Sequence, residues 1–183
     1  MSINLRLSLF TAVSALLLTG TAAAQDNPAG HQHGRAELQL SIEETRIDAF
    51  LLSPAANLVG FEHAPETDEQ KQALADLQRW AETRPMVNTP EGHCRVESAE
   101  VYASWPKKAG DRGHDHHDHE SHGGHADIEI SQSLDCPGLG KELETPLTAR
   151  FPAMEHLDVQ WVGLYGQGSR QLGPGRNQLI LDE

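Results

Sequence analysis

A segment from Gly113 to His125, with the sequence GHDHHDHESHGGH, places the strongest constraint on how this chain can fold. Ten of its thirteen residues are His, Asp, Glu or Ser, and burying them would leave polar groups without hydrogen-bond partners. No hydrophobic core can use such a segment. We therefore predict a disordered, solvated, His-rich insertion at about residues 106–126.

The same segment has the composition of a metal-binding loop. Neutral imidazole suits zinc, nickel and copper, the carboxylates add oxygen donors, and the alternating spacing lets neighbouring rings fold onto one ion. The predicted ligands are the six histidines of the segment: His114, His116, His117, His119, His122 and His125. The alternative is a polar linker or the scar of a purification tag, but the interspersed acids and the internal position argue against a tag.

Residues 1–24 predict export from the cytoplasm. Arg6 precedes an apolar run from Leu7 to Leu18, and three alanines at 22–24 complete a pattern typical of a cleaved secretory signal peptide. The run is shorter than the ~20 residues that a membrane-spanning helix needs, and no second hydrophobic stretch follows. No cysteine follows the cleavage site to carry a lipid. We expect a periplasmic protein without stable membrane insertion.

The remaining residues, 25–183, suit a single domain. The chain has a formal net charge of −13 and no basic stripe, so it would repel a phosphate backbone. This charge argues against nucleic acid as a partner. The same negative field raises the local concentration of cations, in agreement with a metal-binding insertion.

Two cysteines, Cys94 and Cys136, flank the insertion and are predicted to form a disulfide, because the compartment is oxidising and their number is even. Zinc ligation by the thiolates is the weaker alternative, since no close Cys spacing is present. Strands are predicted at 94–104 and 127–134. The insertion then joins two paired strands, with the cysteines near their far ends, where a cross-strand bridge is reasonable.

The rest of the chain indicates an α+β domain. Alternating or β-forming residues predict further strands at 35–42, 46–53, 147–151, 158–165 and 178–181. A helix is predicted from Thr67 to about Glu82, with Trp80 in its apolar stripe. Segment 166–175 is predicted as a loop and 152–157 as a short helical turn. The expected fold is mainly an antiparallel β-sheet or sandwich with one principal helix on one face.

Three landmarks together resemble a known family: HQHG at 31–34, SPAANLVGFEH at 53–63, and a cysteine pair that brackets a His-rich insertion. They resemble the ZrgA-type family of periplasmic zinc-binding proteins over nearly the whole mature chain. NLVGFEH is the most specific piece, because His-rich runs occur in many unrelated metal proteins. The resemblance implies a zinc-repressed gene product that binds zinc outside the inner membrane and assists its import, without known catalysis.

The shared motifs provide a second candidate site, which is expected to be ordered. Its ligands would be His31, His33 and His63, with Glu62 as a further donor. A His-x-His pair on an extended segment has both rings on one side, and one or two more donors complete a tetrahedron around zinc. The alternative is that Glu62 and His63 bond to the following turn while His31 and His33 belong to a disordered tail. His93 and His156 are isolated and are not expected to be ligands.

The sequence contains no nucleophile elbow, no phosphate-binding glycine loop and no HExxH motif, so we expect no enzyme activity. The resemblance implies a zinc carrier that assists delivery to an import system, with a zinc ABC-type importer or its periplasmic binding protein as partner. Two alternatives stay open. One is an envelope structural or interaction protein, and the other is a nickel or copper buffer whose insertion is a non-specific metal sink.

Overall fold

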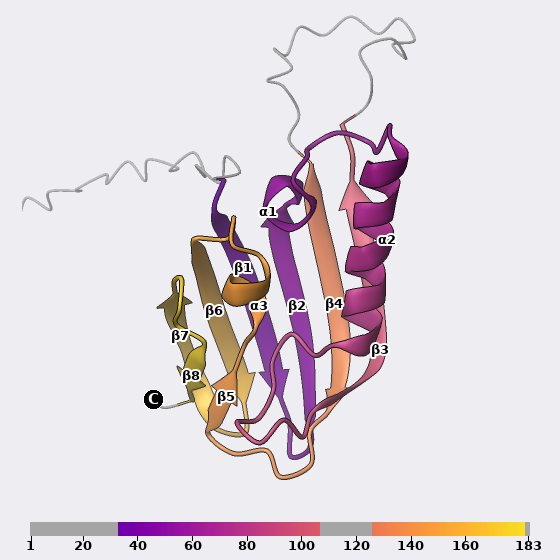
Figure 1. Cartoon of the computed structure of the whole chain (residues 1–183). Coiled ribbons are helices and arrows are strands. Elements are labelled where there is room, and N and C mark those ends of the chain that lie inside the picture. Colours follow the sequence, from indigo (N-terminus) through magenta and orange to yellow (C-terminus); the bar gives the residue numbers. More distant parts are fainter. Residues whose placement is uncertain (1–32, 107–125, 182–183) are drawn as a thin grey trace, which may run out of the picture. The chain divides into compact units, whose positions relative to one another are not determined.

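A six-stranded sheet dominates the computed structural model, which describes residues 33–106 and 126–181. The strand order is β3-β4-β2-β1-β6-β7, and β1 and β6 are its one parallel pair (Figure 1). The strands are β1 (Arg35–Ile42), β2 (Arg46–Pro54), β3 (Arg95–Ser104), β4 (Asp127–Asp135), β6 (His156–Gly163) and β7 (Gly166–Leu172), and a separate pair is β5 (Glu142–Glu144) with β8 (Gln178–Ile180). The α+β prediction is confirmed, with a sheet that is mixed.

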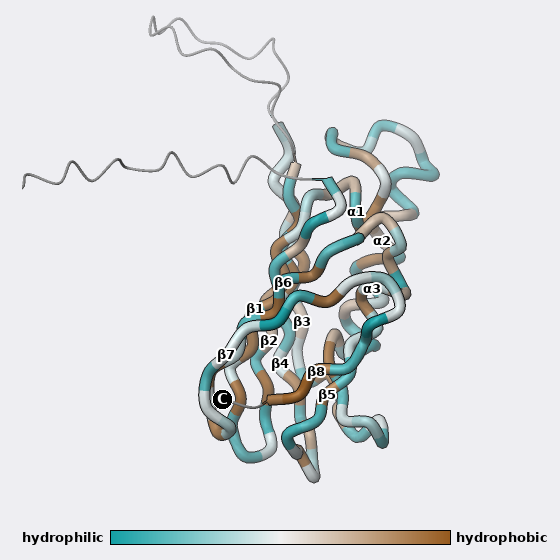
Figure 2. The backbone as a smooth tube through the Cα atoms, turned by 90° about the vertical axis from the view of Figure 1, so that its left-hand side faces the viewer, coloured by the Kyte–Doolittle hydropathy of each residue, from teal (hydrophilic) through white to brown (hydrophobic). Residues whose placement is uncertain are grey.

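The sheet buries one face and leaves the other open to solvent. Along β1, exposed and buried residues alternate without exception, as expected for a strand with one face on a core. Leu38, Leu51 and Ile130 are fully buried on the inner face. Figure 2 shows the helices and the β5–β8 pair on this side of the sheet only. The opposite face is mostly polar, although Phe50, Leu52 and Val162 also lie on it.

The principal helix, α2 (Asp68–Thr83), begins and ends close to its predicted bounds. Thr67 and Gln70 form the expected capping box, in which each satisfies a backbone amide of the other. Hydrogen bonds from the Glu69 backbone amide and from the Thr67 side chain lower the pKa of the Glu69 carboxyl. Leu77 and Ala81 are buried on the helix face that packs on the sheet. The helix covers the side of the sheet that contains β3 (Figure 1).

A buried glutamine on β4 joins the end of α2 to the sheet. The side-chain amide of Gln132 donates to the carbonyl oxygens of Ala81 and Arg84, and its oxygen accepts from the Met86 backbone N–H at 2.8 Å. These bonds satisfy carbonyl groups that the helix itself leaves unpaired at its C-terminus. A polar residue on the apolar face of β4 is therefore a structural cap.

The predicted disulfide is present between Cys94 and Cys136. The two residues directly precede β3 and follow β4, and both are buried. The Cys136 backbone N–H donates to the Thr45 carbonyl oxygen at 2.6 Å, which ties the disulfide to the β1–β2 turn. The insertion leaves the β3–β4 pair at the other end, so the cross-strand arrangement expected from the sequence is confirmed.

Two predictions around residue 150 are wrong. Segment 147–151 was expected as a strand but begins with a short helix, α3 (Leu147–Arg150), and 152–157 contains a turn and the start of β6 in place of a helical turn. The Thr145 hydroxyl accepts from the Leu147 backbone N–H at 3.3 Å, directly before the helix, whose N-cap is Pro146. Periodicity cannot distinguish a strand from a helix over so few residues.

The loop prediction for 166–175 is also wrong, because its first part is the edge strand β7. The glycines in this segment suggested a turn. Gly168 in fact lies against the Trp161 ring of β6, where a Cβ atom would come within 2.3 Å of Cζ2. A glycine in a strand can mark such a close approach. β5 and the short helix α1 (Ala55–Val59) were not predicted from the sequence.

The predicted signal peptide and the six insertion histidines lie outside the described residues. Within residues 33–106 and 126–181, no helix is long and apolar enough to cross a membrane.

Candidate metal-binding site

The segments singled out from the sequence meet at one end of the sheet. Ser104 at the end of β3, Asp127 at the start of β4 and Pro54 at the end of β2 are neighbours in register. β1 starts at the same end, because Glu37 pairs with Leu52, two residues before Pro54 (Figure 1). Three parts of the chain are therefore close together in space. They are the two boundaries of the insertion, the start of β1 directly after His33, and the connection from β2 to α2.

The short helix α1 holds the start of β1 through a buried side chain. Asn57 is 4% exposed, and its side-chain oxygen accepts from the Gly34 backbone N–H at 2.9 Å. Its amide nitrogen donates to the Arg35 carbonyl oxygen at 2.9 Å and to the Ser53 hydroxyl at 3.2 Å. The N-terminal motif is thus fixed to the NLVGFEH motif directly after His33. Asn57 lies in the NLVGFEH motif, but no local sequence pattern predicts this role for it.

A left-handed glycine then directs the chain back toward β1. Gly60 ends α1 with a φ of 85°, a conformation that residues with a Cβ atom rarely adopt. Glu62 follows, and its Oε1 lies 3.5 Å from Nε2 of His33. Two ligands at ~2.0–2.1 Å from a tetrahedral zinc ion are about 3.3 Å apart, so this spacing is close to that of a shared ion. It is equally the spacing of an ion pair without metal.

The environment of this pair is asymmetric. The Glu62 side chain is 19% exposed, whereas that of His33 is 59% exposed. The carboxylate is held within the protein surface and the imidazole is accessible to solvent. Such an arrangement can present two donors to an ion that arrives from outside.

The His63 side chain does not point toward His33 and Glu62, as the expected site would require. Its Nδ1 lies 3.0 Å from the Ala64 carbonyl oxygen, its Nε2 lies 3.5 Å from the Gln70 amide nitrogen, and its ring is 5.5 Å from that of Phe61. His63 therefore contacts the start of α2. Across 33–106 and 126–181, no group of three His, Cys, Asp or Glu residues is close enough to hold a metal ion. The structure brings together His33 and Glu62, while His31 lies outside the described residues.

The two boundaries of the insertion attach to the same α1 region. Before the insertion, the Trp105 ring stacks on Phe61 with centroids 5.8 Å apart and planes at 16°. After it, the Ala126 carbonyl oxygen accepts from the Ala55 backbone N–H at 2.8 Å. The insertion thus begins and ends beside the segment that carries Glu62 and His63. The aromatic residue next to Pro106 was the signal that could have revealed this anchor.

Neither isolated histidine joins the pair. The His93 backbone N–H donates to the Thr89 hydroxyl, and the residue lies beside the disulfide, at the opposite end of the β3–β4 pair. His156 is exposed at the start of β6.

Comparison with known proteins identifies the class to which this architecture belongs. The family model described as ZrgA family zinc uptake protein matches residues 30–181, which include the whole sheet and the insertion. The chain belongs to the ZrgA family of zinc uptake proteins, so the resemblance seen in its motifs is confirmed. No curated protein matches the sequence.

Proposed function

We propose that this protein works in the periplasm, where it captures zinc ions and assists their delivery to an import system. Membership of a zinc uptake family supports a role tied to zinc. The predicted signal peptide at 1–24 supports the compartment. The proposed recipient is a zinc ABC-type importer or its periplasmic binding protein.

One observation carries the proposal: the His33–Glu62 pair and both boundaries of the His-rich insertion are at the same end of the sheet. A two-donor pair is too small for a closed zinc site, which needs four ligands. The six insertion histidines can supply the missing ligands because the chain that contains them starts and ends beside the pair. We therefore infer one composite site, in which fixed donors and insertion donors share an ion.

Two other proposed ligands fit this site. His31 is two residues before His33, so on an extended segment the two rings share one side. His63 would have to rotate away from the Ala64 carbonyl oxygen, at the loss of a hydrogen bond worth about 1 kcal/mol. A bound zinc ion can offset a loss of that size. His63 is therefore proposed as a ligand of the loaded state.

Release is as important as capture for a carrier. Ordering the insertion around an ion costs conformational entropy that a preformed cage avoids, so the affinity is expected to be moderate. Because the disulfide and the core are at other places in the fold, zinc can leave without disrupting them. This behaviour suits a donor. We propose no catalytic step.

Two other functions are open to test. Imidazole and carboxylate donors also accept nickel and cupric copper, and copper would bind most tightly on intrinsic affinity, so the insertion could act as a non-specific metal buffer. An envelope structural protein is the other alternative. A zinc uptake protein should have its gene repressed by zinc, whereas a structural protein need not.

The direct test is calorimetric titration of the mature protein with zinc, nickel and copper. The double variant H33A/E62Q should weaken the tightest zinc equivalent by about tenfold or more, since even the outer partners of metal ligands contribute that much. His156→Ala is the matched control, because it removes an exposed histidine near the same end and should leave the affinity unchanged. Equal effects of both variants would contradict the composite site.

A further inference from the structure

The two edges of the large sheet are built differently. β3, at one edge, has a bulge between Val96 and Ser98 and carries acidic residues such as Glu100. Bulges and charges on edge strands prevent the pairing of further strands. β7, at the other edge, pairs with β6 without a register shift, and Arg170 is its only charged residue. The sequence of β7 therefore contains little that would prevent a further strand from pairing with it.

The backbone of β7 presents a row of hydrogen-bonding groups at the edge of the sheet. On β6, the N–H groups of His156 and Leu164 donate to carbonyl oxygens of the β1 segment, so even-numbered residues of β6 face β1 and odd-numbered residues face β7. The odd-numbered residues of β6 are opposite even-numbered residues of β7. The backbone N–H and C=O groups of Gln167, Ser169 and Gln171 therefore point away from β6. No strand within residues 33–106 and 126–181 pairs with them.

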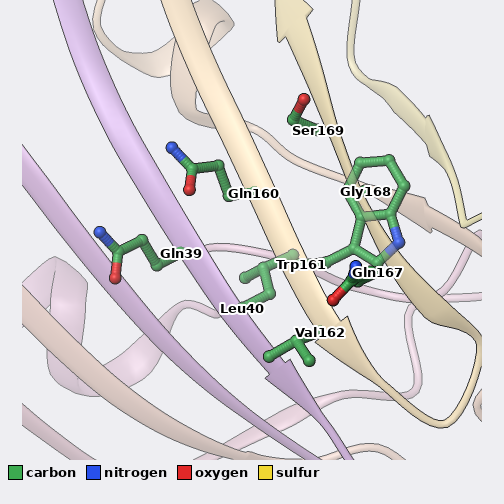
Figure 3. A pocket seen from close by; sticks show the side chains of 8 residues that line it. All are labelled: Gln39, Leu40, Gln160, Trp161, Val162, Gln167, Gly168 and Ser169. Carbon is green, nitrogen blue, oxygen red and sulfur yellow. The ribbon is translucent and has the colours of Figure 1, made fainter. Parts of the chain in front are cut away.

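The side chains of these three residues are exposed and uncharged. Gln167 and Ser169 line a hollow of about 560 Å³ on the open face of the sheet, which Figure 3 shows together with Gln160 of β6. None of the residues that line this hollow carries a charge. The Gln171 amide nitrogen donates to Asp158 at 2.8 Å, and its amide oxygen can accept a hydrogen bond from another donor. The open face beside β7 is therefore neutral and rich in hydrogen-bonding groups.

A second copy of β7 is complementary to this edge. A two-fold axis perpendicular to the sheet makes two edge strands antiparallel, and an axis at Ser169 pairs all 7 residues of each strand. Ser169 is then opposite its own counterpart, and Gln167 is opposite Gln171. These are the residues whose backbone groups point outward, so each such pair can form two hydrogen bonds. Arg170 is opposite Gly168 in this register, and the two arginines do not face each other.

We propose that this protein forms a weak symmetric dimer by antiparallel pairing of β7 with β7 of a second copy. The two sheets become continuous, and the neutral hollows of the two copies adjoin on one face. The contact is weak because it consists of one strand from each copy, and because two chains with a net charge of −13 repel each other. The insertion leaves from β3 and β4 at the other edge, so the second copy does not cover it.

Sedimentation velocity tests the dimer, in metal-free buffer so that zinc cannot bridge two insertions. From micromolar to millimolar concentration, the mature protein should show a monomer–dimer equilibrium. Ser169→Lys should raise the dissociation constant of the dimer by about tenfold or more, because it puts two lysines opposite each other at the axis. Ser131→Lys is the matched control, since it adds the same charge at an exposed position of the open face, on the inner strand β4. That variant should dimerise as the unchanged protein does.

Amide hydrogen exchange, measured by NMR, tests whether β7 is the contact. As the protein concentration rises, exchange should slow at Gln167, Ser169 and Gln171, because their amides then donate to the second copy. The amides of Gly168 and Arg170 face β6 in the monomer, so their exchange should change little. An alternating pattern of this kind is specific to strand pairing.

Three results would overturn the proposal. A protein that stays monomeric over the whole concentration range does not pair through β7. A dimer that Ser169→Lys leaves intact, or in which the three outward amides exchange as fast as in the monomer, uses another surface. A dimer that added salt dissociates is held by attraction between charged groups, whereas backbone pairing between two acidic chains should persist or strengthen when salt screens their repulsion.

Discussion

The two ends of the β3–β4 pair are held by different interactions. At one end, Cys94 and Cys136 are joined covalently and buried, and Cys136 is bonded to the β1–β2 turn. At the other end, Trp105 stacks on Phe61. The His33–Glu62 pair and both boundaries of the insertion are at this second end. The comparison indicates that the disulfide is separated from the groups proposed to bind zinc, so the disulfide can be removed while those groups stay in place.

The largest effect on stability is expected from substitution of Gly163, which pairs with Ile42 at the end of the sheet that contains the β1–β2 turn. Gly163 has a φ of 147°, and a Cβ atom there would lie 1.9 Å from the Ile42 carbonyl oxygen. Gly163→Ala should therefore lower the free energy of unfolding by about 3 kcal/mol or more, through strain and loss of β1–β6 pairing. Gly140→Ala is the control, because nothing lies within 4 Å of its Cβ position. Chemical denaturation of both variants measures the difference, and equal stabilities would refute the packing argument.

Removal of the disulfide should have the next largest effect. C94A/C136A should lower the unfolding free energy by ~2–4 kcal/mol, because the bond restricts the unfolded chain across a separation of 42 residues. Zinc binding should persist in the folded variant, since the sulfurs are at the end opposite to the donors. Loss of zinc binding without loss of folding would reopen cysteine ligation. Denaturation and zinc titration of the same sample check both parts.

Acidification should weaken zinc binding at the end of the sheet that contains His33 and Glu62. Each histidine must lose its proton to bind zinc, and the ordinary imidazole pKa is ~6.5. Between pH 6.5 and 5.5, a site with two histidines should lose about 30-fold in zinc affinity, and calorimetry should detect proton release on binding. Carboxylates titrate near ~4, so a site without histidine would keep its affinity over this interval. A flat profile would therefore refute histidine ligation.

Asn57 combines both roles, because its buried hydrogen bonds stabilise the fold and it lies beside His33 and Glu62, the proposed zinc ligands. Asn57→Ala should reduce the unfolding free energy by ~1–3 kcal/mol, and without this link to β1 the tightest zinc equivalent should weaken by about tenfold. Asn88→Ala is matched to it, since the Asn88 side chain accepts from the Cys94 backbone N–H at 2.8 Å at the other end. That variant should lose stability and keep its zinc affinity. Equal zinc affinities for both variants would remove Asn57 from the site.

The sequence predicted the parts that depend on local pattern. The β1 alternation, the capping box at Thr67 and the cysteines flanking paired strands were all sufficient to predict their elements. The predictions for the segments near residues 150 and 168 were wrong, because short apolar runs and glycines occur in more than one type of secondary structure. Long-range contacts decided them, including the approach of Trp161 to Gly168.

The candidate site was predicted in its components but not in its arrangement. Composition was sufficient to identify the histidines, and the motifs were sufficient to select His33 and Glu62. Their 3.5 Å contact depends on a side chain 24 residues after His33, Asn57, whose hydrogen bonds no local pattern specifies. The direction of His63 toward Gln70 is likewise a property of the packed α1–α2 connection.

Deletion of residues 111–125 tests the separation of folding from zinc capture most directly. Zinc stoichiometry from calorimetry and the melting temperature in metal-free buffer should be measured on the same deletion variant. We expect fewer zinc ions per chain and an almost unchanged melting temperature, because a solvated insertion contributes little packing. An unchanged stoichiometry would contradict zinc capture by the insertion, and a large fall in melting temperature would contradict its independence from the core.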